Sequence, residues 1–244
     1  MNVFAANPLQ PLIEFFEAIL KFFHDSIGLG WGAAIIALTL VVRLALLPLT
    51  LKQFKSMQAM ASLQPEIKKL QERYKGDKER LNQEMMRFYR ENKVNPFASC
   101  LPMVAQIPVF LALFYMLQDD LRRDICGKTT PCGSTPESQF FFIPDLTDKA
   151  TGGVLITLIL LYIGSQVFSS LLMTVSADKN QRRIMLALPL IFVFFIINFP
   201  AGLIVYWITT NTWTIGQQFL VRKLFPKPDP IEAKPDAGSK PARG

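Results

Sequence analysis

Histidine and cysteine are scarce in this 244-residue chain, which has one histidine and three cysteines. His24 is the only candidate for a histidine-based catalytic triad, and a zinc site of the His/Cys type would lack ligands. The apolar segments also contain no paired aspartates and no Ser/His pair, which intramembrane proteolysis would require. We therefore expect a protein that is not an enzyme, with no catalytic residue, no metal site and no cofactor.

Charged residues are missing from four long stretches. Residues 94–118, 150–177 and 184–221 contain none, and residues 26–51 contain only Arg43. A membrane-spanning helix needs about 20 apolar residues, so the first three stretches along the chain predict one span each. The last stretch has 38 residues with a turn signal at 198–202, which predicts two helices. The sequence thus predicts an all-α membrane protein with five transmembrane helices.

Basic residues are distributed unevenly between the spans. Twenty of the 26 Lys and Arg residues lie in 52–93, in 178–183 and in the tail from Arg222. Because cytoplasmic segments carry an excess of basic residues, we expect the N-terminus outside and the C-terminus in the cytoplasm. Residues 1–10 have no basic region and no cleavage-like site, so we expect no classical signal peptide.

The predicted segments follow from this topology. They are an external N-terminal segment with an amphipathic helix (1–28), transmembrane helix 1 (29–51), a cytoplasmic helical hairpin (52–95), transmembrane helix 2 (96–118), an external loop (119–150), transmembrane helix 3 (151–175), a cytoplasmic loop (176–183), transmembrane helix 4 (184–198), an external turn (199–201), transmembrane helix 5 (202–220) and a disordered basic tail (221–244).

The segment before the first span has the pattern of an amphipathic helix. Glu14, Glu17, Lys21 and Asp25 recur at helical spacing, and apolar residues fill most positions between them. A helix of this kind fits the outer surface of a membrane. A helix packed on an extracellular protein partner is the alternative.

The first cytoplasmic segment has the pattern of a helical hairpin. Gly76 and Asp77 supply a helix stop and a new N-cap between two amphipathic arms. Four methionines on these arms form an adaptable apolar surface, which either closes the seam of the hairpin or recruits hydrophobic substrates: Met57, Met60, Met85 and Met86.

Arg43 lies near the middle of the first predicted span. An arginine at the centre of a transmembrane helix costs about 2.5 to 3.5 kcal/mol. Snorkelling of the long side chain toward the cytoplasm is one explanation. The other is that Arg43 faces a wet cavity, and no acidic residue of any span is available to neutralise it. In that case, a positive site stays free for a ligand that arrives.

The candidate companions of Arg43 are uncharged. Each one alone could be interhelical glue, but contributions from four spans favour a shared hydrophilic groove. They include Thr39 one turn before Arg43, Gln106 in the second span, Ser165, Gln166, Ser169 and Ser170 in the third, and Tyr206, Trp207 and Asn211 in the fifth.

Four blocks of sequence resemble the YidC/Oxa/Alb family of membrane protein insertases, in its short five-span bacterial form. They are ALTLVVRLALLPLT (37–50), LQPEIKKLQERYKGD (63–77), NPFASCLPMVAQIPVFLALFYML (95–117) and FPAGLIVYWITTNTWTIGQQ (199–218). The resemblance implies a five-helix core around a groove open to the cytoplasm and to lipid. It also implies that Arg43, Thr39, Gln166 and Trp207 with Tyr206 beside it correspond to the family's groove residues.

The implied function is insertion and folding of membrane proteins in the bacterial plasma (inner) membrane. The implied partners are nascent membrane proteins, the lipid bilayer and, in cooperation, the Sec translocon and the ribosome, with no small-molecule substrate. A small transporter or channel with Arg43 as an anion site is the alternative, and a chaperone that only shields helices is a third possibility. In the external loop, Cys126 and Cys132 could form a disulfide, since oxidation persists outside the cell.

Overall fold

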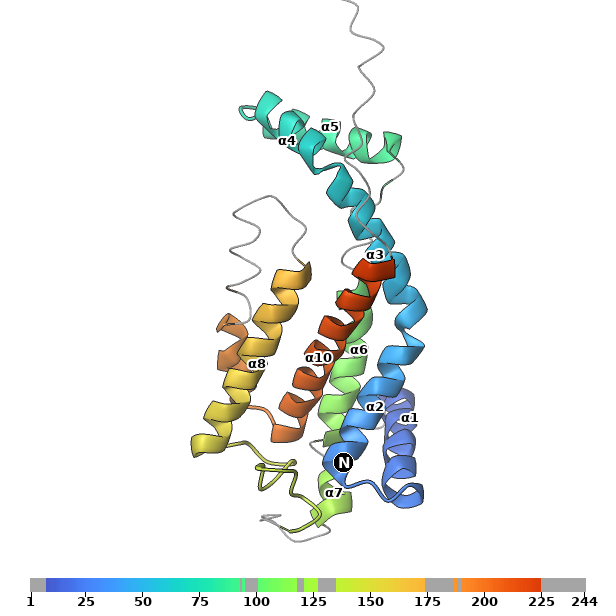
Figure 1. Cartoon of the computed structure of the whole chain (residues 1–244), viewed down its shortest axis with the longest axis vertical. Coiled ribbons are helices and arrows are strands. Elements are labelled where there is room, and N and C mark those ends of the chain that lie inside the picture. Colours follow the sequence, from blue (N-terminus) through green and yellow to red (C-terminus); the bar gives the residue numbers. More distant parts are fainter. Residues whose placement is uncertain are drawn as a thin grey trace, which may run out of the picture.

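In the computed structural model, the chain forms a helical bundle with a helical extension at one end (Figure 1). The structure describes residues 8–92, 94, 101–117, 121–126, 135–173, 187 and 190–224. The helices are α1 (Gln10–Lys21), the π-helix η2 (Phe22–Ser26), α2 (Trp31–Ala45), α3 (Leu47–Ser62), α4 (Gln64–Arg73), α5 (Lys78–Glu91), α6 (Leu101–Tyr115), α7 (Leu121–Cys126), α8 (Gly152–Met173) and α10 (Ala201–Leu224). Residues 190–196 are also helical.

One described helix is long and apolar enough to cross a membrane by itself, over Gly152–Leu172 in α8. The pair Trp31–Ala45 and Leu47–Met60 meets the same criteria together, with a bend of 55° between its halves. α10 is long enough to cross a membrane but contains too many polar residues to meet the criteria. In α6, the apolar part Gln106–Tyr115 is shorter than a full span. The count of five spans therefore stays a prediction; part of the predicted fourth span (184–186, 188 and 189) and most of the tail lie outside the described residues.

Two prolines divide the helical path between the first span and the hairpin. α2 ends two residues before Leu47, and Pro48 follows; α3 ends at Ser62, and Pro65 lies just inside α4. Proline has no amide hydrogen and its ring clashes with the preceding turn, so a helix breaks just before it. The predicted span over 29–51 is thus a bent pair of helices, and the first arm of the predicted hairpin is two helices.

The hairpin consists of α4 and α5, which pack against each other. The Asp77 side chain accepts a hydrogen bond of 3.0 Å from the Arg80 amide at the start of α5, which confirms the predicted N-cap. α4 and α5 lie at one end of the molecule, and the loop 135–150 lies at the other end together with α7 (Figure 1).

The loop 135–150 caps the start of α10. The amides of Ala201 and Gly202 donate to the carbonyls of Asp148 and Leu146 at 2.9 and 2.8 Å. The first amides of a helix have no partner inside the helix, so these carbonyls satisfy them. A Cβ atom on Gly202 would lie 3.0 Å from the Leu146 oxygen, so glycine permits the close approach.

The helix α1 packs on the bundle along α2 and α6 (Figure 1). Ile13, Phe16 and Leu20 are buried in the common core, whereas Phe15 and Phe22 are more than half exposed. The chain itself therefore covers one apolar face of this helix. Its predicted position on the outer membrane surface stays a prediction.

Candidate functional site

Buried residues change character along the bundle. α2, α8 and α10 all run from the end with loop 135–150 toward the hairpin end (Figure 1). In the initial part of each helix, up to Leu38, Tyr162 and Tyr206, the buried side chains are almost entirely apolar. Beyond these residues and in α3, many buried side chains are polar: Thr39, Gln53, Ser169, Thr210, Asn211 and Gln218. The half of the bundle nearer the hairpin is thus the candidate site.

The first polar contact in α10 lies at Tyr206, where the apolar half ends. Tyr206 is 3% exposed, and its hydroxyl accepts a hydrogen bond from the Gln106 side-chain amide of α6. The Arg43 guanidinium of α2 interacts electrostatically with the same tyrosine. Tyr206 thus interacts with two other predicted groove residues, each from a different helix.

Arg43 itself is half-buried. Among the described residues, no carboxylate forms a salt bridge with it; the ion pairs found there involve Lys21, Lys69 and Arg87. The positive charge of Arg43 is therefore left without a counter-ion in the described part of the protein.

Two further polar contacts follow along α10. The Asn211 side chain donates to the Ser165 hydroxyl of α8 at 3.2 Å, and Gln217 donates to the Thr50 hydroxyl of α3 at 2.8 Å. At about 1.5 Å of rise per residue, Tyr206, Asn211 and Gln217 lie at successive levels of the helix. α10 thus makes one polar contact with each of α6, α8 and α3.

Thr39 and Gln166, which the resemblance also assigned to the groove, lie apart from the contacts at Tyr206. Thr39 is 2% exposed, and its hydroxyl donates to the Ile35 carbonyl of the same helix at 2.7 Å. Gln166 is half-buried and makes no hydrogen bond with the described residues. Neither side chain joins the contacts at Tyr206, and their role as groove residues stays a prediction.

Trp207 lies in an aromatic cluster that the sequence analysis did not find. Its ring centroid is 5.1 Å from Phe110, 5.3 Å from Phe192 and 5.7 Å from Phe199. Aromatic rings attract each other at such distances. Its members come from α6, from residues 192–199 and from α10, so only the tertiary structure shows that they meet. Trp207 forms part of this cluster beside Tyr206, and its contact with substrate stays a prediction.

The methionines of the hairpin segment differ in exposure. Met86 is 42% exposed, while Met60 and Met85 are half-buried. The side chain of Met57 lies outside the described part of the chain. Met86 is thus available at the surface of α5, and the recruitment of substrates by this group stays a prediction.

At the end of the bundle with α7, Cys126 is disulfide-bonded. The other two cysteines, Cys100 and Cys132, lie outside the described residues, so the pairing with Cys132 stays a prediction.

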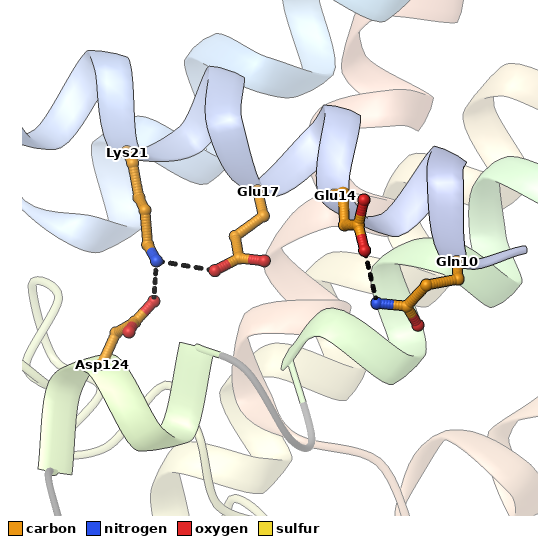
Figure 2. Close-up of polar contacts among 5 residues, drawn as sticks. All are labelled: Gln10, Glu14, Glu17, Lys21 and Asp124. Atoms are coloured by element: carbon orange, nitrogen blue, oxygen red, sulfur yellow. Dashed lines mark hydrogen bonds and ion pairs between the residues drawn. The ribbon is translucent and has the colours of Figure 1, made fainter. Parts of the chain in front are cut away.

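An ion-pair cluster joins α1 to α7 on the same side of the protein (Figure 2). The Lys21 ammonium donates to Glu17 at 2.6 Å and lies 3.0 Å from the Asp124 carboxylate. The hydrogen bonds to Glu17 and then Asp124 raise the pKa of Lys21 above 10.5. In the sequence, Lys21 stands out only as part of an amphipathic pattern, and the residues of α7 belong to the predicted loop 119–150.

The comparisons with known proteins agree with this architecture. The model of the 60Kd inner membrane protein family matches residues 22–228. A membrane protein insertase YidC from Streptomyces avermitilis is 37% identical over 243 residues, which cover 89% of this chain and 57% of the relative. The YidC of Syntrophobacter fumaroxidans is 40% identical over 228 residues, covering 90% of this chain and 38% of the relative.

A solved structure is also similar. The crystal structure titled "Active YidC insertase crystal structure with the first transmembrane domain resolved" matches with a TM-score of 0.64 and 28% identity, covering 86% of this chain and 45% of that one. The helical fold and these matches together define an integral membrane protein with transmembrane helices. The chain belongs to the 60Kd inner membrane protein family, which is the YidC/Oxa family that the sequence blocks indicated. It spans 38% to 57% of the length of the two curated relatives.

Proposed function

We propose that this protein inserts integral membrane proteins into the bilayer and helps them fold. The relatives named above are membrane protein insertases. The observation that carries the proposal is the polar half of the bundle, in which Arg43 has no acidic partner among the described residues. A hydrophilic groove between α2, α6, α8 and α10, open to the cytoplasm and to lipid, would receive the hydrophilic tail of a substrate there.

The cost of placing an acidic residue in the bilayer is comparable to the energy returned by a nearby arginine. An aspartate near the centre of a bilayer costs about 2.5 to 3.5 kcal/mol. An opposite charge at 4 Å in an effective dielectric of 20 returns about 4 kcal/mol before desolvation. One arginine therefore makes the entry of an acidic tail tolerable without trapping the tail. No covalent step is needed, so the proposed activity requires no catalytic residue and no cofactor.

The substrate's apolar segment then leaves sideways into lipid along α8 and α10. Both helices expose large apolar side chains in their second halves. Phe168 of α8 is 47% exposed and Phe219 of α10 is 55% exposed, and their ring centroids are 6.5 Å apart. A newly entered helix would meet this apolar edge directly beside the polar half.

The proposal includes a location and partners. The protein lies in the bacterial plasma (inner) membrane with its N-terminus outside and its C-terminus in the cytoplasm, as the distribution of basic residues predicts. The methionine-bearing helical segment 52–95 recruits nascent membrane proteins, and the Sec translocon and the ribosome cooperate with it.

Reconstitution of the purified full chain tests the proposal. Vesicles containing the chain receive a small single-span protein with an acidic translocated tail, and protease protection of that tail is measured. We expect several times more protection than in vesicles containing an unrelated polytopic protein of equal mass. Protection equal to this control would refute the insertase. Flux of a labelled anion without protection would favour the transporter instead.

A further inference from the structure

The external loop carries a tight turn with two exposed phenylalanines at its tip. The Phe140 amide donates to the Ile143 carbonyl at 2.9 Å, and the Ile143 amide donates back at 2.8 Å. Phe141 and Phe142 occupy the two positions between them. Phe141 is 90% exposed and Phe142 is 48% exposed. Water is a poor environment for such a pair, so something other than water is expected to cover them.

The backbone of Phe141, the more exposed of the two residues, adopts an unfavourable conformation. Phe141 has φ of 51°, and it is the one described residue other than glycine with positive φ. Bulky residues rarely adopt this conformation, which glycine adopts freely. Strained residues persist where the surrounding structure fixes them, and they concentrate at functional sites. The presence of a phenylalanine at this strained position therefore indicates that its ring has a function.

The base of the turn is anchored in the protein. Ile143 is 3% exposed. A Cβ atom on Gly32 would collide with the Phe140 ring, so this ring lies directly on the first turn of α2. The residues that follow cap the first turn of α10 through the Leu146 carbonyl. The turn is therefore held at the level where two helices of the bundle begin.

The same level is the start of the lipid-facing surface of α8. This helix begins at Gly152, and Ile156 and Leu160 near its start are 61% and 65% exposed. α8 is the described helix that can cross a membrane by itself. The turn is thus held at the end of the bundle where this exposed apolar surface begins.

The size of the tip argues for lipid rather than for a protein partner. A stable protein interface buries about 800 Å² on each side and involves some 20 residues. Two side chains on a narrow turn provide far less. Aromatic rings at the headgroup level, in contrast, are a common way to hold a protein at a fixed depth.

We propose that Phe141 and Phe142 form a lipid-insertion turn, which enters the boundary between headgroups and acyl chains of the outer leaflet and fixes the depth of the external loop. The inference rests on the membrane placement included in the proposed function. It does not depend on insertase activity.

Depth-dependent fluorescence quenching tests the turn. The full chain with Phe141→Trp is reconstituted in vesicles of ordinary or brominated phosphatidylcholine, and the signal of the unsubstituted chain is subtracted to remove its native tryptophans. Glu137→Trp, at an exposed polar position of the same loop, is the matched control. We expect several-fold stronger quenching by bromolipid for Phe141→Trp than for the control, and weaker quenching by aqueous iodide.

Equal iodide quenching of the two variants would overturn the inference, and so would shielding of Phe141→Trp that requires an added protein. A second variant guards against misfolding. Phe141→Gly relieves the strained backbone and removes the ring. We expect it to unfold in detergent at the same or a higher temperature than the unsubstituted chain, while the loop becomes more accessible to protease in vesicles. Unchanged protease access would also count against the turn.

The outcomes separate this inference from the proposed function. If the turn stays in water while the chain inserts substrates, only the inference of a lipid-insertion turn is refuted. A lipid-buried turn in a chain without insertase activity overturns the proposed function alone.

Discussion

Gln106 of α6 donates a hydrogen bond to the hydroxyl of Tyr206 of α10, across 100 residues of sequence. The Arg43 guanidinium of α2 interacts with the same tyrosine. This contact marks the level at which the apolar half of the bundle ends and the polar half begins. Tyr206 therefore serves both as a link between helices and as a neighbour of the charge on which the proposed function depends.

Removal of this link should reduce stability by a modest and measurable amount. Interhelical hydrogen bonds in membranes are worth about 0.6 kcal/mol on average and up to about 1.7 kcal/mol. We expect a coupling energy in that range between Gln106→Leu and Tyr206→Phe in a double-mutant cycle of unfolding in mixed micelles. Strictly additive effects of the two substitutions would show that the contact contributes nothing.

The polar residues of the site could be predicted singly from sequence, but their partners could not. Arg43, Gln106 and Tyr206 stand out because polar residues are rare in apolar helices. Which of them meet depends on the rotation of each helix within the bundle, and one sequence contains no direct signal of that rotation. The cluster around Trp207 was missed for the same reason, since its members come from α6, α10 and residues 192–199.

Local sequence signals predicted local structure better than they predicted contacts between helices. The Asp77 N-cap was correct because a capping residue acts within one turn. Pro48 and Pro65 carry an equally local signal for the two helix breaks, but the prediction extended one helix across each of them. The turn at Phe141 could not be predicted, because a phenylalanine with positive φ contradicts its own conformational preference.

The close approach at Gly202 predicts a second effect on stability. A valine side chain there would collide with the Leu146 carbonyl, the Ile35 side chain and the Leu117 side chain. Overpacking of this kind costs about 1 to 3 kcal/mol. We expect Gly202→Val to lower the thermal unfolding temperature in detergent. Gly216→Ala on the same helix is the control, because no atom lies within 4 Å of the added carbon. It should leave stability unchanged or raise it by up to about 1 kcal/mol, and equal losses in both variants would contradict this account.

The ion pairs of Lys21 predict a small dependence of stability on pH. Its pKa in the folded protein is raised above 10.5, chiefly by the hydrogen bond to Glu17. The contribution is therefore fully present below pH 10.5 and disappears as the pH rises through the higher folded-state value. Because the side chain is 40% exposed, the effect should not exceed that of a surface salt bridge, about 0.2 to 1 kcal/mol.

Asp124→Asn should reduce this contribution below pH 10.5 and leave stability in more alkaline solution unchanged. The measurement is the unfolding free energy of both proteins between pH 8 and 12, as an order-of-magnitude window around the lysine pKa. A difference between the two that grows with pH would contradict the assignment.

The free thiols of the protein can be counted directly. Cys126 is disulfide-bonded, and we expect Cys132 to be its partner. Titration of the unfolded, unreduced protein should then yield one free thiol, and mass spectrometry of its peptides should assign that thiol to Cys100. After Cys132→Ser, the titration should yield two. A free Cys132 in the native chain would show that the pairing is wrong.

The central claim is that the unpaired charge of Arg43 receives acidic substrate tails. The most direct test varies the charge of residue 43 and the charge of the substrate tail together. Arg43→Ala, Arg43→Lys and the native chain are reconstituted with three versions of one single-span substrate, whose translocated tails are acidic, neutral or basic. We predict that Arg43→Ala loses insertion of the acidic tail by about tenfold or more, corresponding to about 1.4 kcal/mol, while the neutral and basic tails are little affected and Arg43→Lys restores most of the loss. Equal insertion of all three tails by Arg43→Ala and the native chain would contradict the account.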